Sequence, residues 1–203
     1  MTEMPAKLKA RFDRKAAKRD IKKKQIAGSA IDALVELGYA NTSLRDIASK
    51  SDLSLGMLHY YFEDRSDLII YCVQLYKEEF VRDINAALDT AEGRDAVLDA
   101  FSGALAVSIV DDTQTHRLWY DIRTQAMFDE TFRPVVDEIE AMLIDIVRHA
   151  FGKTGNEIPP MVAIHYAALD GVFRMLMQNQ LTGDLKTKDE LATIFRALLT
   201  QFF

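Results

Sequence analysis

The sequence predicts an all-α protein of about nine helices, and three observations support this prediction. The chain of 203 residues contains only 4 Pro and 9 Gly, so little interrupts long helices. Apolar residues recur at three- and four-residue spacing along most of the chain, as they do on one face of a helix. No segment shows the alternation of apolar and polar residues that predicts a half-buried strand.

The first two expected helices are separated by a glycine and a capping sequence. Apolar residues at helical spacing predict a helix over residues 19–37, and Gly38 follows as its C-terminal cap. Ser43-Leu-Arg-Asp46 has the form of a capping box, in which the serine and the acidic side chain each bind a backbone N–H group of the first turn. A second helix is therefore expected to begin at Leu44.

A tight polar turn and two further caps define the next elements. Ser51-Asp52-Leu53 forms the turn, and Ser54 can cap a third helix over residues 55–62. Asp64-Arg-Ser-Asp67 is a second capping sequence, from which a long helix runs to about Leu88. Two short helices joined by a tight turn predict a helix-turn-helix, a motif that places one helix in the major groove of DNA.

Five further helices are expected after a break in the pattern at residues 91–94. Their predicted ranges are 95–110, 115–127, 134–151, 160–180 and 188–202. Pro134 and Pro160 lie in first turns, where a helix tolerates proline. The expected organisation is a basic N-terminal arm (1–18), a helix-turn-helix domain (19–67), a connecting helix (68–90) and a C-terminal helical domain (91–203).

The net charge of −6 conceals a strong asymmetry along the chain. Residues 1–24 carry ten Lys or Arg against three Asp or Glu, whereas residues 68–203 carry 12 basic and 21 acidic residues. A basic segment directly before a helix-turn-helix is expected to lie on DNA phosphates. The alternative is a solubilising tail with no partner.

Several function classes lack the residues that they need. A single Cys72 cannot form an intrachain disulfide, which favours a reducing cytoplasm, and none of the 4 His pairs with a second ligand at metal-binding spacing. No apolar stretch is long enough to span a membrane, and no leader peptide is apparent. Without a nucleophile–base motif or a phosphate-binding loop, we expect no enzyme, no catalytic residue, no metal and no cofactor.

The predicted third helix carries the candidate DNA-reading residues. A helix that reads the groove must bring its N-terminal residues to the base edges, and four positions are free to point outward: Ser54, Leu55, Met57 and Tyr60. Gly56 removes a side chain where the backbone approaches DNA closely. Side chains that can bond to phosphates surround the helix: His59, Tyr60, Tyr61 and Arg65.

This stretch resembles the DNA-binding region of the tetracycline-repressor (TetR) family of bacterial transcriptional regulators. The matching positions are Ile26 through Leu68, with Gly38-Tyr39, Thr42-Ser43-Leu-Arg-Asp-Ile-Ala48, Leu53-Ser-Leu-Gly-Met-Leu58, Tyr61-Phe62 and Arg65-Ser-Asp-Leu68. The chain departs from the family at Ser51-Asp52-Leu53, where Ala-Gly-Val is usual, and at Leu58–Phe62, where Leu-Tyr-x-His-Phe is common. Arg65 replaces a typical lysine and keeps its charge.

The resemblance implies roles at a DNA operator for ten residues besides Gly56. By resemblance, Thr42, Ser43, Tyr61 and Arg65 contact phosphates, while Arg45, Ser54, Leu55, Met57 and Tyr60 lie in or beside the major groove close to Gly56. His59 stands where the family often has a DNA-contacting tyrosine and can bond to a phosphate or a base edge. The C-terminal helices of the family form a ligand cavity and a dimer interface. In this chain they look loosely similar to the choline-responsive repressor subgroup, chiefly through residues 168–173.

One face of the predicted helix 115–127 has the composition of a ligand pocket. It combines aromatic area, a cation and a thioether at helical spacing: His116, Trp119, Tyr120, Arg123 and Met127. The alternative is that Trp119 and Met127 belong to the core while His116 and Arg123 are solvated. From the helix 160–180 the expected ligand-binding set also includes His165 and Phe173, although the sequence favours a hydrogen-bonded core or interface position for His165 over a cavity position.

The eighth and ninth predicted helices, 160–180 and 188–202, are expected to form the contact of a homodimer. The last helix carries more apolar surface than one packed face requires, and Gly171 allows close helix approach. Two recognition helices must also meet successive major grooves about 34–36 Å apart. The leading interpretation is a homodimeric repressor of a palindromic operator that responds to a small molecule. The alternatives are an all-α small-molecule enzyme or carrier, and an activator on the same fold.

Overall fold

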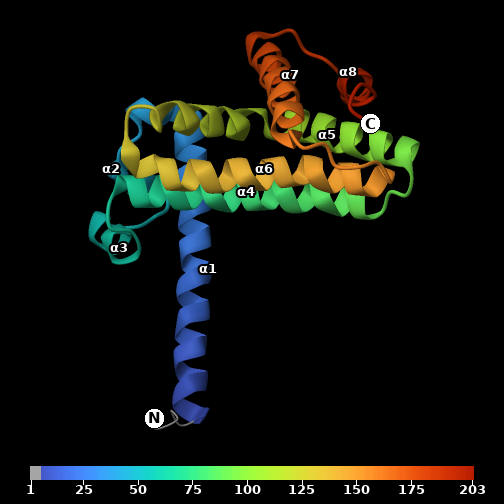
Figure 1. Cartoon of the computed structure of the whole chain (residues 1–203). Coiled ribbons are helices and arrows are strands. Elements are labelled where there is room, and N and C mark those ends of the chain that lie inside the picture. Colours follow the sequence, from blue (N-terminus) through green and yellow to red (C-terminus); the bar gives the residue numbers. More distant parts are fainter. Residues whose placement is uncertain (1–5) are drawn as a thin grey trace. The chain divides into compact units, whose positions relative to one another are not determined.

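The computed structural model (Figure 1) describes the backbone of residues 6–203, and the side chains of residue 14 and of residues 16–203. Every regular element in this part of the chain is helical, which confirms the all-α prediction. The chain divides into two compact units, Met1–Leu75 and Tyr76–Phe203. Their boundary falls inside the segment 68–90, which was expected to connect two domains.

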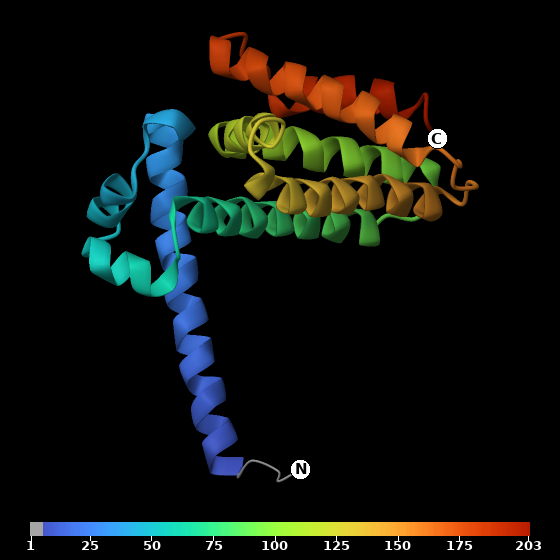
Figure 2. The same cartoon turned by 60° about the vertical axis from the view of Figure 1, so that its left-hand side comes forward.

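The N-terminal unit is built on one long helix. Its elements are α1 (Ala6–Leu37), the short 3-10 helix η1 (Tyr39–Asn41), α2 (Leu44–Lys50), α3 (Leu55–Tyr61) and the start of α4 (Arg65–Asp89). Figure 2 shows α2 and α3 on one side of α1. The core between them is apolar and consists of Ile26, Ala27, Ala30, Ala33, Ile47, Leu58, Phe62, Leu68 and Cys72. The Cys72 thiol is free and buried in this core.

The first helix starts earlier than the sequence pattern suggested. We expected it to begin near Arg19 after a separate basic arm, whereas α1 already begins at Ala6. The physical reason is composition, because residues 6–18 are rich in Ala, Lys and Arg, which favour helix, and contain no Gly or Pro. Most of the expected arm is therefore helical, while residues 1–5 and the side chains of 6–13 and 15 lie outside the described residues.

The predicted caps and turn are present. The Ser43 backbone N–H donates to Asp46 Oδ2 over 2.8 Å and the Asp46 N–H donates to Ser43 Oγ over 3.3 Å, so the capping box of α2 is complete. Ser54 Oγ accepts the Met57 N–H over 3.2 Å and starts α3. Between these helices, Asp52 adopts a φ of 52°, in the left-handed region that favours glycine.

The C-terminal unit is a helical bundle. After the last part of α4 come α5 (Arg94–Gln125), the short 3-10 helix η2 (Glu130–Phe132), α6 (Arg133–Thr154), α7 (Val162–Thr182) and α8 (Lys188–Leu199). The expected helices 95–110 and 115–127 are the two halves of α5, which is kinked at Asp112 with φ −121° and ψ 19°. The described residues thus form eight α-helices rather than nine, because the break between those two halves bends the helix without ending it.

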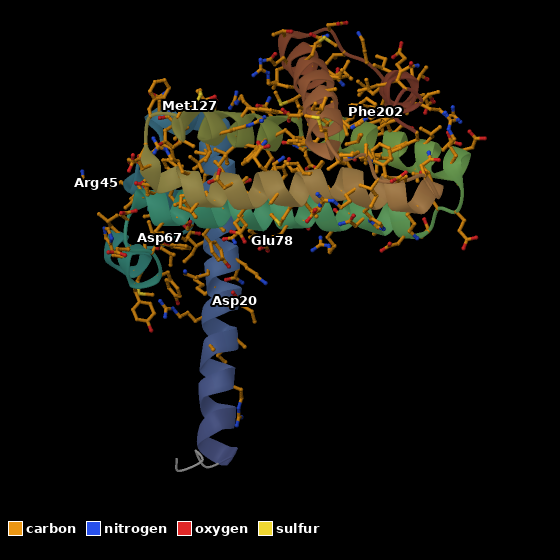
Figure 3. All side chains as sticks on the ribbon, in the orientation of Figure 1. Asp20, Arg45, Asp67, Glu78, Met127 and Phe202 are labelled. Carbon is orange, nitrogen blue, oxygen red and sulfur yellow. The ribbon has the colours of Figure 1, made fainter. Side chains whose placement is uncertain are left out.

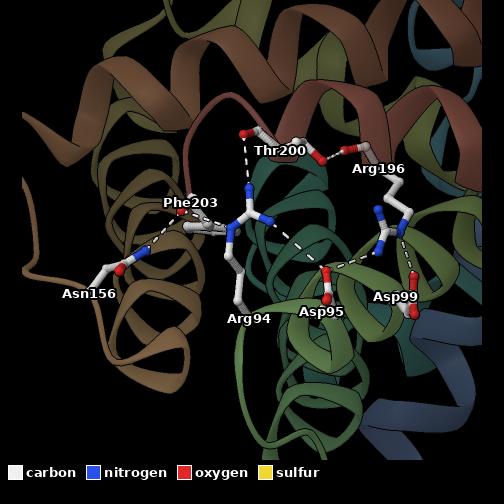
Figure 4. A network of polar contacts seen from close by, with 7 residues as sticks. All are labelled: Arg94, Asp95, Asp99, Asn156, Arg196, Thr200 and Phe203. Carbon is white, nitrogen blue, oxygen red and sulfur yellow. Dashed lines mark hydrogen bonds and ion pairs between the residues drawn. The ribbon is translucent and has the colours of Figure 1, made fainter.

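Helix α5 is the centre of this unit, since α6, α7 and α8 all pack against it. Polar contacts hold the C-terminal end of the chain (Figure 4). Arg94 Nε, in the first turn of α5, and Asn156 Nδ2, in the loop after α6, both donate to the Phe203 carbonyl over 3.0 Å. Beside them, Arg196 Nε donates to Asp99 over 2.6 Å. These contacts hold α8 against α5 from the solvent side.

Two classes of site are missing from the part of the chain that the structure describes. No group of three or more His, Cys, Asp or Glu side chains comes together in a way that could hold a metal ion. None of the helices has both the length and the apolar character required to cross a membrane.

Candidate nucleic-acid interface and internal cavity

Helix α3 buries one side in the core of the N-terminal unit and exposes the opposite side to solvent. Leu58 and Phe62 are buried in the core of the N-terminal unit, as the sequence predicts. On the opposite side, Met57 is exposed and the Tyr60 ring is 57% exposed. A Cβ atom added at Gly56 would meet no protein atom within 4 Å. Packing inside the protein therefore does not require a glycine at position 56.

Seven of the eleven expected DNA-contacting residues are exposed in the N-terminal unit: Ser43, Arg45, Ser54, Gly56, Met57, His59 and Tyr60. Figure 3 shows the Arg45 side chain directed into solvent from α2. Leu55, Tyr61 and Arg65 are half-buried, and Tyr61 packs against the core of this unit. His59 Nδ1 lies 3.3 Å from the Glu63 carbonyl, so one ring nitrogen is held at the end of α3.

Thr42 is the expected phosphate ligand that the structure does not support. Its side chain is only 3% exposed, and its hydroxyl donates to the Gly38 carbonyl over 2.7 Å. In this arrangement the hydroxyl proton is already used inside the protein, so a phosphate contact by Thr42 stays a prediction without support from the geometry.

Arg65 acts on the same loop. Its Nε donates to the Thr42 carbonyl over 2.8 Å, a second nitrogen donates to the Tyr39 carbonyl, and the guanidinium lies 4.3 Å from the centre of the Tyr39 ring. Arg65 therefore positions the segment before α2.

Cations of α1 lie beside the aromatic end of α3. The Arg19 guanidinium is 5.8 Å from the centre of the Tyr60 ring, and Lys23 Nζ is 4.7 Å from that of Phe62. Tyr60 in turn meets Tyr61 edge to face with ring centres 5.0 Å apart. The exposed face of α3 is thus continuous with positive charge on α1, an arrangement suited to a phosphate backbone beside a groove.

A second feature lies inside the C-terminal unit. A cavity of about 40 Å³ is lined by residues of α4, α5, α6 and α7. Its wall is largely apolar and aromatic, and includes Phe80, Phe101, Leu105, Trp119, Leu143, Ile146, Val147, Leu169 and Phe173. Four polar side chains also line it: Lys77, Tyr120, Tyr166 and Asp170.

Lys77 is the most unusual group of this cavity. Its side chain is 3% exposed, and its Nζ lies 4.7 Å from the centre of the Phe80 ring and 5.2 Å from those of Tyr76 and Trp119. Burial lowers the pKa of the Lys77 ammonium to about 7, although Asp170 and Glu140 act in the opposite direction. Lys77 is therefore poised between its charged and neutral forms near neutral pH.

The carboxylates near Lys77 are held by other residues. Arg123 donates from Nη1 to Asp170 over 2.6 Å and pairs through Nε with Glu140 over 2.7 Å, while the Tyr120 hydroxyl donates to Asp170 over 2.9 Å. Burial outweighs these neighbours at Glu140, whose pKa is raised. This network links α5, α6 and α7 across one end of the cavity.

Of the seven residues expected at a ligand, Trp119, Tyr120 and Phe173 line the cavity, and Arg123 adjoins it through Asp170. The other three lie elsewhere. Both ring nitrogens of His116 are hydrogen-bonded, one to Tyr76 and one to Ser108 at 2.5 Å, and burial lowers the pKa of this core histidine.

Met127 and His165 also lie outside the cavity wall. Met127 is 67% exposed on the loop after α5 (Figure 3), and His165 stacks edge to face on Phe151 and Phe202. Helical spacing alone could not show that Met127 and His165 lie outside the cavity. The kink in α5 and the packing of the C-terminal residues decide which side chains meet it.

Sequence reasoning missed Lys77. A signal was available, because Lys77 lies four residues after Val73 and seven before Ile84, both buried on the same helix. A lysine at that position of an apolar stripe faces inward.

Comparison with known proteins relates the N-terminal unit to a family of regulators and the whole chain to solved helical structures. Residues 26–72 match the family described as bacterial regulatory proteins, tetR family. The chain is 28% identical over 126 residues to the HTH-type transcriptional regulator BetI of Burkholderia thailandensis, which covers 59% of this chain and 62% of that protein. It is 34% identical over 58 residues to the HTH-type transcriptional regulator PksA of Bacillus subtilis, which covers 29% of this chain and 28% of that protein. The chain thus spans less than two thirds of the length of these curated relatives.

Solved structures share the fold over most of the chain. A putative transcriptional regulator from Pseudomonas aeruginosa PAO1 superposes with a TM-score of 0.71 at 19% identity, covering 89% of both chains. The fatty acid degradation regulator FadR from Bacillus halodurans superposes with a TM-score of 0.70 at 16% identity, covering 87% of this chain and 92% of that one. At these identities the likeness shows the fold.

Proposed function

We propose that this chain, whose residues 26–72 are a DNA-binding domain of the tetR family, is a transcriptional regulator that binds a two-fold operator as a homodimer. In this proposal a small molecule in the cavity of the C-terminal unit releases the operator, and the protein works in the cytoplasm. The observation that carries the proposal is the arrangement of α3. This capped helix buries one side in the protein core and exposes the other around Gly56, Met57 and Tyr60. The comparisons are with regulators, so an enzyme or carrier is not favoured.

The DNA contacts follow from what the N-terminal unit exposes. Arg45 is free to reach base edges or phosphates from α2, and Arg19 stands beside Tyr60 at the edge of the α3 face. A base contact confers sequence preference, whereas a phosphate contact adds affinity for every sequence. The two arginines are therefore expected to differ when they are replaced.

The proposal is tested by footprinting and fluorescence anisotropy on the DNA that flanks the protein's own gene. Arg45→Ala should weaken the best site by about 1–3 kcal/mol and relax preference at one base position. Arg19→Ala should weaken all sequences alike and reduce the salt slope by about one. Arg148→Ala, which removes an exposed arginine of the C-terminal unit, is the matched control. Absence of any protected two-fold site at moderate salt would contradict the proposal.

A dimer contact is proposed mainly on α7, where apolar and small residues form an exposed stripe. Its members recur at alternating three- and four-residue spacing: Met161, Ile164, Ala168, Gly171 and Met175. This heptad-like spacing places them on one face, and an apolar stripe of this kind favours helix pairing. In α8 the corresponding apolar residues Leu191, Phe195 and Leu199 are buried inside the protomer. The contribution that we expected from this last helix is therefore smaller.

Sedimentation velocity tests this contact. Met175→Glu places a charge on a side chain that is 50% exposed in the α7 stripe, and the dimer should dissociate to monomer at micromolar concentration. Met127→Glu is the matched control, because it adds the same charge to an exposed methionine outside α7. Equal sedimentation of both variants as dimers would place the interface elsewhere.

Release of the operator requires a ligand that favours one dimer state over the other. A coupling free energy of about 1–3 kcal/mol lowers operator affinity by roughly 5–150-fold. The cavity offers such a ligand contacts with four helices at once, so its occupation can change how α4, α5, α6 and α7 pack. Operator titrations with and without ligand measure this coupling directly.

A further inference from the structure

The cavity of the C-terminal unit contains buried hydrogen-bond donors that nothing satisfies. Lys77 is almost fully buried, and no ion pair or hydrogen bond to it occurs among the residues that the structure describes. The Trp119 indole N–H is also buried and has no hydrogen-bond partner. Buried polar groups of folded proteins are nearly always paired, so the unpaired Trp119 N–H on the same cavity wall as the buried Lys77 favours a ligand that supplies a hydrogen-bond acceptor.

The acceptors already present are engaged with other residues. The Asp170 carboxylate receives hydrogen bonds from Arg123 and Tyr120, and the Glu140 carboxylate pairs with Arg123. Both carboxylates therefore influence Lys77 through space without contacting it. The rings of Tyr76, Phe80 and Trp119 surround the ammonium, and both nitrogens of His116 are already bonded. The Tyr166 hydroxyl also lines the cavity and is buried without a hydrogen-bond partner, so it is a further polar group that a ligand can meet.

The size of the cavity restricts what can supply this acceptor. A volume of about 40 Å³ is enough for a small polar group such as a carboxylate. Apolar side chains form most of the wall, so an attached hydrocarbon body would be accommodated by displacing side chains such as Phe80 and Phe173.

We propose that the effector is a small apolar monocarboxylic acid whose carboxylate binds Lys77 Nζ and the Trp119 indole N–H inside the cavity. This proposal rests on the proposed function of the cavity as an effector site. A bound carboxylate stabilises the ammonium form of Lys77. Because the pKa of free Lys77 is about 7, binding at pH 8 draws a proton onto the protein, and affinity falls as the pH rises above 7.

Isothermal titration calorimetry on the full chain tests the ligand class. The probes are hexanoate and benzoate, with hexanamide as the neutral analogue and hexylammonium as the cationic one. At pH 8, in buffers of different ionisation enthalpy, we expect the acids to bind at least ten-fold more tightly than the amide, with uptake of close to one proton. Equal or tighter binding of the amide or the amine would overturn the proposal.

Variants assign the effect to the two donors. Lys77→Met keeps the length of the side chain and removes the ammonium, and it should weaken acid binding at least ten-fold and abolish proton uptake. Trp119→Phe should weaken acid binding without abolishing proton uptake, because Lys77 remains. Lys188→Met, at an exposed lysine paired with Asp111 outside the cavity, is the control and should change neither quantity. Unchanged acid binding by Lys77→Met would overturn the assignment.

Operator binding is measured separately, so that the two proposals fail in different ways. Acid binding with proton uptake in a protein that protects no DNA would support the ligand assignment and refute the regulator. Operator binding that is released by the amine or amide but not by the acids would support the regulator and refute the ligand assignment.

Discussion

Replacing Lys77 by methionine should make the ligand-free protein more stable, and the gain should depend on pH. The native lysine is 3% exposed and its ammonium has no oxygen partner in the described cavity. Methionine has a similar length and no charge, so it fills the same space without the desolvation of an ammonium group. The substitution therefore isolates the electrostatic term.

The magnitude follows from the two pKa values of the lysine. The unfolded-state pKa is 10.5 and the folded-state pKa is about 7. At pH 7 half of the folded protein is already deprotonated, and the difference destabilises the native protein by roughly 4 kcal/mol. We expect Lys77→Met to raise the free energy of unfolding by a similar amount, about 4 kcal/mol, at pH 7.

The pH dependence has a defined sign. Between pH 7 and 10.5 the unfolded chain binds more protons at Lys77 than the folded protein does. The stability of the native protein therefore rises with pH in this window, by up to about 1.4 kcal/mol per pH unit, while the methionine variant lacks this contribution. The advantage of the variant is largest at pH 7 and below, and it disappears as the pH approaches 10.5.

Urea unfolding at pH 7, 8, 9 and 10 measures this difference, at one fixed protein concentration because a dimer's apparent stability depends on it. All other titrating groups are shared by the two proteins and cancel in the difference. A stability difference that stays constant from pH 7 to 10 would refute the reasoning, because it would mean that the native Lys77 titrates as it does in the unfolded chain.

Three further substitutions test the N-terminal unit. Asp52→Gly should raise the free energy of unfolding by about 1 kcal/mol, because Asp52 has a φ of 52° where glycine is unstrained; a lower melting temperature would contradict this. Gly56→Ala should leave the melting temperature unchanged or slightly higher, since the added Cβ meets nothing within 4 Å. It should nevertheless weaken operator binding several-fold. Unchanged operator affinity would refute the inference that DNA approaches the backbone closely at Gly56. Arg65→Ala should destabilise the unit by about 2 kcal/mol, because two backbone carbonyls lose a charged donor. Arg65→Lys should recover only part of this loss, because one ammonium cannot reproduce both donors, and a full recovery in thermal melts would contradict this.

Local chemistry explains why the N-terminal unit was largely predictable. The capping box of Ser43 and Asp46, the cap at Ser54 and the turn around Asp52 each involve residues within a few positions of one another. Such contacts depend on the order of residues and little else. The burial of Thr42 could not be predicted in this way, because its hydroxyl lies against the carbonyls of Ala33 and Gly38, and a threonine that binds a phosphate looks the same in sequence as one in a buried hydrogen bond.

The C-terminal unit was predictable only in outline. Helical spacing identified Trp119, Tyr120 and Arg123 as one face, but it could not distinguish the cavity from the core beside it. The partners of Arg123 and Tyr120 are supplied by Asp170, which lies 47 and 50 residues away along the chain. The kink at Asp112 turns His116 towards Tyr76 and Ser108, where both of its nitrogens are satisfied.

By itself, the sequence determined the helical class, the helix-turn-helix with its caps, and the kind of polymer that its exposed face suits. Only the tertiary structure decided which polar groups are satisfied and which remain unpaired in a cavity. The physical reason is that periodicity defines a face within one helix, whereas burial and pairing depend on what the other helices bring to that face. Lys77 illustrates the difference: it stands in an ordinary charged stretch of sequence, and it becomes a buried cation only because α5, α6 and α7 close around it.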